Sequence, residues 1–118
     1  MGVHYPGTLM VYLYLAIAIV VEVIATLMLK ASVGFTKPLF GMGAVFFYGI
    51  AGMLLAVVLT KMNVGMAYAI WAGAGIALIS IASAIIWKQS YDIYGVAGIL
   101  LIGVGVVLIT MKSSVVIH

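Results

Sequence analysis

Long apolar runs alternate with short polar segments along the whole chain. The runs have nineteen to twenty-four residues, and the segments between them have four to nine. Helices of that length extend about 28 to 36 Å, enough to cross a bilayer's hydrocarbon core. Strands of a membrane β-barrel would instead alternate in polarity. The pattern therefore predicts an all-α membrane protein with four transmembrane helices, at about residues 11–29, 39–59, 64–87 and 93–111.

The remaining residues are too few for a further domain. Residues 1–10 form an N-terminal lead, residues 11–112 form the four-helix transmembrane domain, and residues 113–118 form a C-terminal tail. The short connections require neighbouring helices to run antiparallel. The lead contains no Lys or Arg and the first run is long enough to span, so we interpret this run as a membrane helix and not a cleaved signal peptide.

Composition indicates an integral membrane protein, and we expect it to be a multi-pass protein of the inner (plasma) membrane. The chain is 68% hydrophobic and only 6% charged, whereas soluble domains carry about 25% charged residues. Its five cations are all lysines that stand singly, so no basic patch for nucleic acid exists. There is no cysteine, no metal-ligand spacing, no phosphate-binding loop and no nucleophile–base pair. We therefore expect no enzymatic activity, no metal and no cofactor.

Glu22 is the one charged residue inside the first apolar run. A charged side chain at that depth costs about 2.5 to 3.5 kcal/mol on insertion scales, so such a residue is a candidate functional site. Every lysine lies at the end of a run, and Thr26, one helical turn on, can form a hydrogen bond but cannot neutralise a charge. Loss of solvation favours the neutral acid. We expect Glu22 to bind a proton and to release it when a cation arrives.

Aromatic residues supply a second candidate feature. Tyr68 and Trp71 lie three residues apart in the third run, and Tyr48 lies deep in the second. The faces of such rings attract organic cations, by about 0.5 to 2 kcal/mol each. They are also common at membrane interfaces, where they need not bind anything. The pattern alone leaves both interpretations open.

Glycines mark places where helices can bend or pack closely. Gly73 and Gly75 stand two apart in the third run, which suits a local hinge or a close approach. Gly95, Gly98 and Gly105 form a small-residue stripe in the fourth run, which favours helix association in lipid. Packing within one chain would explain the same stripe.

The lysines do not specify one orientation in the membrane. The second connection and the C-terminal end carry Lys61 and Lys112, while the opposite side carries Lys30, Lys37 and Lys88. Two against three is a weak bias under the positive-inside rule.

These residues together resemble the small multidrug resistance family. The resemblance rests on the segments EVIATLMLKASVGFTKP, with Glu22, Lys30 and Gly34-Phe35, and GMAYAIWAGAGIALIS, with Tyr68 and Trp71, and extends to Tyr48, Gly98 and Gly105. It implies four transmembrane helices that work as an antiparallel dimer of inverted protomers. It also implies exchange of protons, as the coupling ion, for cationic substrates at Glu22, with Tyr48, Tyr68 and Trp71 lining the site.

The subtype follows from one position near Glu22. Guanidinium exporters of this family carry a Trp three residues after the membrane Glu, but here that residue is Ala25, which resembles the multidrug, quaternary ammonium subtype. In one departure from the family, Asn63 stands where a Pro is common before the third helix; Asn can still cap a helix.

The leading interpretation is a proton-coupled antiporter that exports hydrophobic organic cations. One alternative is an exporter of a small polar cation, such as guanidinium or a polyamine. Another is an accessory membrane subunit of a heteromeric transporter, in which Glu22 would be replaceable. We expect a homodimer in the lipid bilayer, with a heterodimer with a paralogue left open.

Overall fold

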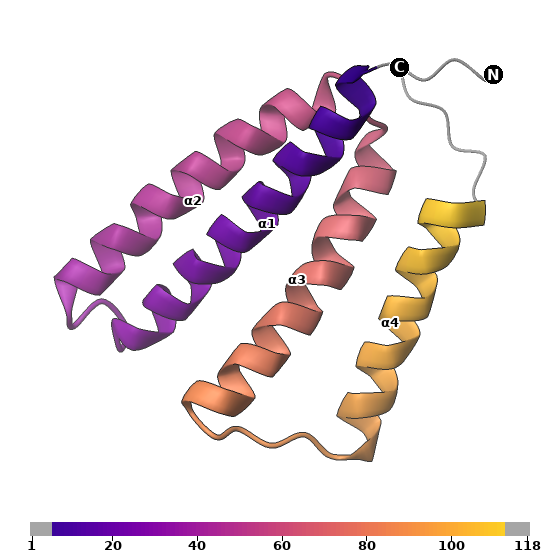
Figure 1. The fold of residues 1–118 in the computed structure, drawn as a ribbon. Coiled ribbons are helices and arrows are strands. Elements are labelled where there is room, and N and C mark those ends of the chain that lie inside the picture. The colour runs from indigo at the N-terminus through magenta and orange to yellow at the C-terminus, as the bar shows by residue number, and fades with distance from the viewer. Residues whose placement is uncertain (1–5, 113–118) are drawn as a thin grey trace.

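The computed structural model describes residues 6–112, and these form four α-helices in an antiparallel succession (Figure 1). They are α1 (Pro6–Ala31), α2 (Pro38–Leu59), α3 (Val64–Ile86) and α4 (Ile93–Lys112). The predicted all-α fold with four helices is confirmed. The first part of the expected lead and the expected tail, residues 1–5 and 113–118, lie outside the described residues.

The first helix begins at Pro6, before the position that its apolar pattern predicts. The reason is that proline is well suited to the first turn of a helix: its fixed φ matches the helix, and the backbone N–H that it lacks has no intrahelical partner there. The pair Pro6-Gly7 therefore starts a helix within the segment that was predicted as an N-terminal lead.

Three of the helices are long and apolar enough to cross a membrane. The segments are Leu9–Ala31, Pro38–Leu59 and Val64–Ile86, and a shorter apolar segment, Ile93–Ile109, lies in α4. Their exposed surfaces are largely aliphatic or aromatic, as expected of helices whose solvent is hydrocarbon.

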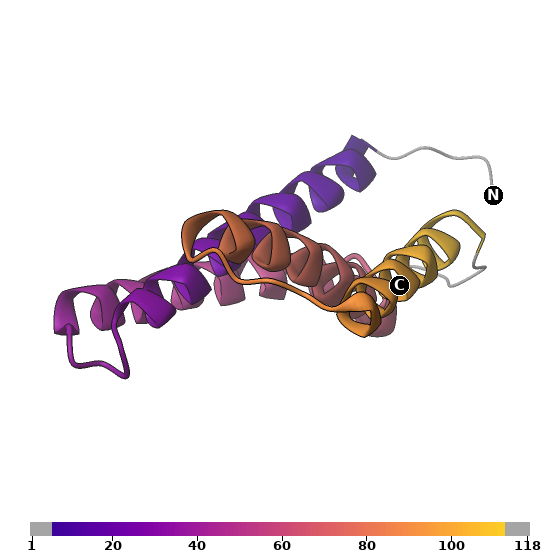
Figure 2. The same cartoon turned by 90° about the horizontal axis from the view of Figure 1, so that it is seen from below.

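The four helices form a thin layer. The Cα positions extend 51 × 35 × 17 Å, and Figure 2 shows the same four helices from below, with α4 at the side of α3 away from the α1–α2 hairpin. The α1–α2 hairpin has the most extensive contact, α3 packs on α1, and within the described residues α4 packs on α3 alone. One chain therefore leaves most of α4 and both faces of the layer uncovered.

The core lies at the end of the layer where α1, α2 and α3 converge. It is built from Val11, Leu15 and Ile19 of α1 together with Val58 and Ala67, and Met62 of the connecting turn closes it. Leu15 and Met62 are at most 2% exposed. The α1 residues recur every four positions, so they form one helical stripe. This stripe continues to the turn of α1 that carries Glu22.

Side chains cap the beginnings of α3 and α4. The Asn63 side chain accepts hydrogen bonds from the backbone N–H groups of Gly65 and Met66 at 2.9 and 3.3 Å, which confirms the expected cap. Asp92 accepts the N–H of Gly95 at 2.8 Å in the same way. The chain's second acid is thus a helix cap.

The connection between α1 and α2 is organised by the buried Ser32. Its hydroxyl donates to the Leu29 carbonyl at 2.6 Å and accepts the Phe35 N–H at 3.1 Å. Residues 33 to 35 all have positive φ, which is costly for Val33 and Phe35. The Phe35 ring lies against Gly41 of α2, where a Cβ would collide with it. These contacts hold a tight turn at one end of the hairpin.

One contact joins the ends of α1 and α3 on this same side. The Lys30 ammonium lies 5.3 Å from the ring centroid of Trp87, the residue that ends α3. A cation at this distance is attracted by the ring face. The contact joins α3 to α1, the helix that carries Glu22.

Gly73 is the point at which α4 approaches α3. A Cβ at this position would collide with the Val106 side chain and lie 3.6 Å from Ile102. The helix α3 continues without a break through Gly73 and Gly75. Close packing accounts for Gly73, and its predicted role as a hinge stays a prediction.

We predict that Gly73→Ala destabilises the α3–α4 contact by about 1 to 3 kcal/mol, because the added methyl overpacks against Val106. Unfolding of the purified protein in detergent measures the loss. The double variant Gly73→Ala/Val106→Ala should recover part of it, since the second change removes the colliding methyls. Gly103→Ala, with no atom within 4 Å of the added Cβ, is the control. Equal stability of Gly73→Ala and Gly103→Ala would contradict the packing role.

Candidate functional site

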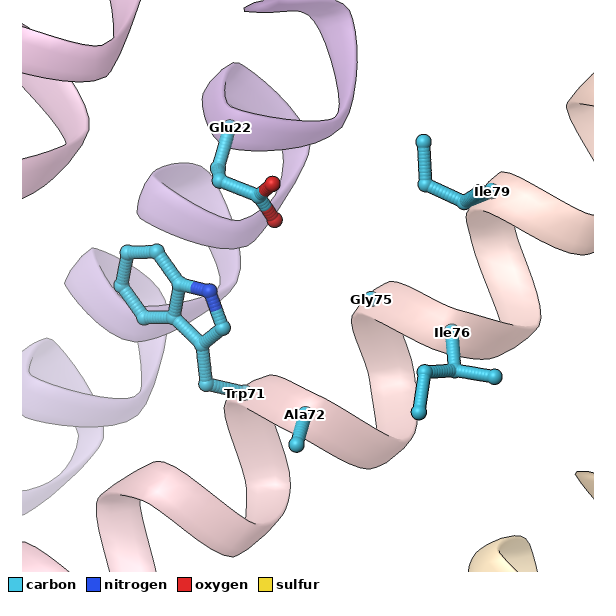
Figure 3. Close-up of a pocket in the computed structure, with 6 residues that line it drawn as sticks. All are labelled: Glu22, Trp71, Ala72, Gly75, Ile76 and Ile79. Atoms are coloured by element: carbon cyan, nitrogen blue, oxygen red, sulfur yellow. The ribbon is translucent and has the colours of Figure 1, made fainter. Parts of the chain in front are cut away.

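A cavity of about 260 Å³ lies between α1 and α3, with Glu22 as its only acid. Figure 3 shows the carboxyl extending from α1 toward α3, with the Trp71 indole beside it. The remaining lining residues come from the same face of α3 and are Ala72, Gly75, Ile76 and Ile79. The cavity thus combines one carboxyl with apolar and aromatic walls.

A chain of hydrogen bonds runs from Glu22 to α2. The Thr26 hydroxyl donates to Glu22 Oε2 at 2.7 Å, and the Thr26 and Tyr48 hydroxyls lie 2.6 Å apart. The sequence predicted all three as site residues. The structure brings them together on the side of Glu22 that faces α2, whereas the cavity lies on the side that faces α3.

The second carboxyl oxygen faces α3. A Cβ built on Gly75 would lie 3.5 Å from Glu22 Oε1, which is ordinary van der Waals contact. Gly75 is buried, and it lets the carboxyl lie close to the backbone of α3. The two oxygens of Glu22 therefore differ: Oε2 accepts a hydrogen bond, and Oε1 lies at the cavity wall.

The two aromatic residues predicted in α3 are placed differently. Trp71 is half-buried and lines the cavity. Tyr68 is 63% exposed and is not among the lining residues of this chain. It nevertheless precedes Trp71 by three residues and Gly75 by seven, so it extends the same helical stripe toward the start of α3.

The three glycines of α4 that were predicted to pack against a helix also differ in their surroundings. A Cβ on Gly95 would meet Asp92 and Tyr91 of its own chain. Gly98 and Gly105 have no atom within 4 Å of such a Cβ. None of the described residues occupies the space beside these two.

In the described part of the chain, no cationic side chain and no group of metal-ligating side chains lies at the Glu22 cavity. None of the lining residues is a lysine or histidine. Among residues 6–112 no three His, Cys, Asp or Glu side chains gather to hold a metal ion. Within the described residues, the Glu22 carboxyl therefore has neither a cationic side chain nor a metal-binding cluster beside it.

The sequence did not single out Ala72, Ile76 and Ile79. They follow Trp71 at helical spacing, at positions i+1, i+5 and i+8, and so fall on its side of α3. Every transmembrane helix has apolar residues at such spacings, so only the position of the opposing acid distinguishes them.

The fold and the cavity define a class: a small multi-pass membrane protein with one acid in a cavity between its helices. Comparison with known proteins identifies the family. Residues 10–102 match the family described as Small Multidrug Resistance protein. The chain is 44% identical over 102 residues to a multidrug transporter of Pseudomonas aeruginosa, with 86% of this chain and 93% of that protein covered.

Two relatives from Escherichia coli support the same family. The quaternary ammonium compound-resistance protein QacE is 42% identical over 107 residues, and the multidrug transporter EmrE is 40% identical over 107 residues. Each alignment covers 91% of this chain and 97% of the relative. The chain belongs to the small multidrug resistance family. It is accordingly a membrane transporter of the inner membrane and not an enzyme, which agrees with the expectations drawn from Glu22 and the family resemblance.

We predict that Gly75→Leu slows the modification of Glu22 by a hydrophobic carbodiimide on the order of tenfold, equivalent to about 1.4 kcal/mol of barrier. The leucine side chain would occupy the cavity in front of Oε1, whereas Gly75→Ala places its methyl at ordinary contact distance and should react nearly as fast as the natural protein. Mass spectrometry of the labelled peptide gives the rate, and the exposed Asp92 serves as the internal reference. A Gly75→Leu protein that reacts at the natural rate would show that the cavity is not the route to the carboxyl.

Proposed function

We propose that this protein is a proton-coupled antiporter that exports hydrophobic organic cations, including aromatic and quaternary ammonium compounds. The observation that carries the proposal is a membrane carboxyl in a cavity that offers it no cation. Relatives named as quaternary ammonium and multidrug resistance proteins point to the same substrates.

Proton and cation compete for Glu22 in this mechanism. A proton on the carboxyl neutralises it when the cavity is empty. An incoming cation restores the electrostatic balance of the carboxylate, so binding of the cation and release of the proton become one exchange. Because either partner neutralises the site, both loaded forms avoid an isolated charge in the membrane.

The cavity walls favour large apolar cations over small polar ones. The Trp71 ring can lie against an aromatic or alkylammonium group, and Ile76 and Ile79 add apolar surface. Ala25, where guanidinium exporters of the family resemble one another in carrying Trp, is fully buried, so an indole could not fit there without rearrangement. A hydrogen-bonding pocket for a small polar cation would need more donors and acceptors than this wall contains.

The transport unit in this proposal is a homodimer of two oppositely inserted copies. In a layer only 17 Å thick, α1 and α3 flank the acid cavity but the faces of the layer are uncovered, and a partner copy would cover one of them. The exposed Tyr68 would then face the shared site, and Gly98 and Gly105 offer free space for close helix contact. Larger transporters achieve alternating access with inverted repeats around a midplane site, and an inverted second copy would provide the same symmetry.

We predict that Glu22→Gln abolishes proton-driven cation transport while the protein remains folded. Gln has the shape of the neutral acid but can neither release a proton nor pair with a cation. Uptake of ethidium into liposomes under an imposed pH gradient measures the activity. Glu22→Asp retains the carboxyl and serves as the matched control, with reduced but measurable uptake. Gradient-driven uptake by the Gln protein at the natural rate would refute the mechanism.

We predict that forcing one orientation removes activity. Several lysines added within residues 1–10 should retain that end on the cytoplasmic side, so all copies insert alike and no inverted pair forms. Co-expression with a copy biased in the opposite direction should restore resistance to ethidium. A co-expressed copy with the opposite bias and the Glu22→Gln change provides the control, because that pair is correctly oriented but lacks one acid. Full activity from a population that inserts in one direction only would disprove the inverted dimer.

A further inference from the structure

Trp87 places a second indole ring outside the Glu22 cavity, at the end of α3. It lies eight residues beyond Ile79, the last cavity residue along this helix, and Lys30 lies eight residues beyond Glu22 on α1. The Lys30 ammonium lies 5.3 Å from the Trp87 ring centroid. Because eight helical residues rise about 12 Å, this contact lies well outside the cavity, at the ends of the two helices that flank it.

The backbone around Trp87 is fixed by local contacts. Its N–H donates to the Ser83 carbonyl at 3.0 Å, which closes the last turn of α3. The Tyr91 hydroxyl lies 3.0 Å from the Ser83 hydroxyl, so the connection to α4 folds back onto that turn. Lys88 has a φ of 55° and changes the direction of the chain directly after Trp87. A residue held in this way loses little conformational freedom when it binds a ligand, which favours binding.

A cation already lies at the face of the Trp87 ring. Anchoring at a membrane interface does not require this contact, because interfacial tryptophans need no cation. Lys30 is exposed and Trp87 is half-buried, so the contact is open to water. A lysine ammonium is strongly hydrated and stands on a flexible stem, whereas quaternary ammonium groups are the cations that aromatic rings in proteins characteristically recognise. Lys30 can therefore leave the ring when such a cation arrives.

We propose that the Trp87 ring is an outer binding site for aromatic quaternary ammonium cations and that the Lys30 ammonium occupies it when no such cation is bound. The choice of ligand rests on the proposed function, but the site does not depend on proton exchange at Glu22. It holds a cation between water and the Glu22 cavity. In an inverted pair of copies, one such site lies at each membrane surface.

The tryptophan content of the chain makes a direct test available. Its two tryptophans are Trp71 and Trp87, so Trp71→Phe leaves Trp87 as the sole indole. Adding Glu22→Gln removes the carboxyl of the inner site. The probe is N-benzylpyridinium, an aromatic quaternary ammonium ion whose pyridinium ring quenches indole emission on contact. In bilayers of zwitterionic lipid, which carry no net charge to attract the probe, quenching of Trp87 should saturate as the probe concentration rises.

Changes at Lys30 test whether its ammonium occupies the site. In this background Lys30→Met should tighten probe binding about two- to fivefold, because the probe no longer displaces a cation from the ring. Lys30→Arg retains a cation that stacks on aromatic faces, so it should bind the probe no more tightly than the protein with Lys30. Lys88→Met is the matched control, because it removes the same charge beside Trp87 while the contact with Lys30 remains. It should leave the affinity nearly unchanged.

A tryptophan that is simply exposed near the interface provides the second control. Tyr94, near the start of α4, is 83% exposed. Tyr94→Trp, in a chain with Trp71→Phe and Trp87→Phe, should be quenched in linear proportion to the probe. Equally linear quenching of Trp87 would overturn the outer site. Equal tightening by Lys30→Met and Lys88→Met would overturn its occupancy by Lys30.

A second measurement applies if the Trp71→Phe protein does not fold. The Glu22→Gln protein labelled with 5-fluorotryptophan gives a ¹⁹F signal for each indole, and Trp87→Phe identifies the signal of Trp87. A Trp87 signal that does not move with added probe overturns the inference. The proposed function fails separately: a natural protein that takes up no ethidium under a pH gradient overturns antiport at Glu22, whereas the Trp87 titration still decides the outer site.

Discussion

The constraint that organises this protein is that an ionisable carboxyl lies within a membrane helix and must have partners there. In hydrocarbon an unpaired charge is costly, so the helices around Glu22 must supply what water would. Thr26 of α1 itself and Tyr48 of α2 supply two hydroxyls in series. α3 supplies a glycine that admits the carboxyl and an indole beside it. The fold thus places the Thr26 and Tyr48 hydroxyls on the side of Glu22 Oε2 and the wall of α3 on the side of Oε1.

The sequence predicted the helices well because membrane solvation is a strong and uniform constraint. A run of some twenty apolar residues has few alternatives to a spanning helix, since every backbone polar group must be satisfied internally. The start of α1 was less predictable, because Pro6 can either end a helix or begin one and its neighbours do not decide between these. Asn63 and Asp92 are caps whose roles follow from local backbone geometry, and the role of Asn63 was foreseen for that reason.

The residues of the candidate site that are rare in a membrane helix could be predicted from the sequence. Their arrangement around Glu22 could not. Glu22 stands out because it is the one acid in an apolar run. Trp71 and Thr26 could be inferred from helical spacing and from the resemblance to the family. Which side of Glu22 each residue occupies could not be inferred, because this depends on how α2 and α3 pack against α1. The link between Thr26 and Tyr48 crosses twenty-two residues and two helices, and no local pattern encodes it.

The two glycines of α3 show how the site is connected to the rest of the layer. Gly73 and Gly75 are two residues apart, which places them about 200° apart around the helix axis, on nearly opposite faces. Gly73 receives Val106 of α4, and Gly75 receives the carboxyl of α1. At Gly73 α3 is packed tightly against α4, whereas at Gly75 a methyl group would still fit beside the carboxyl. Within the described residues α4 packs on α3 alone, so a displacement of α4 relative to α1 must either move α3 or open the contact at Gly73. Because α3 also carries Trp71 and Gly75, a movement of α3 changes the cavity that contains Glu22.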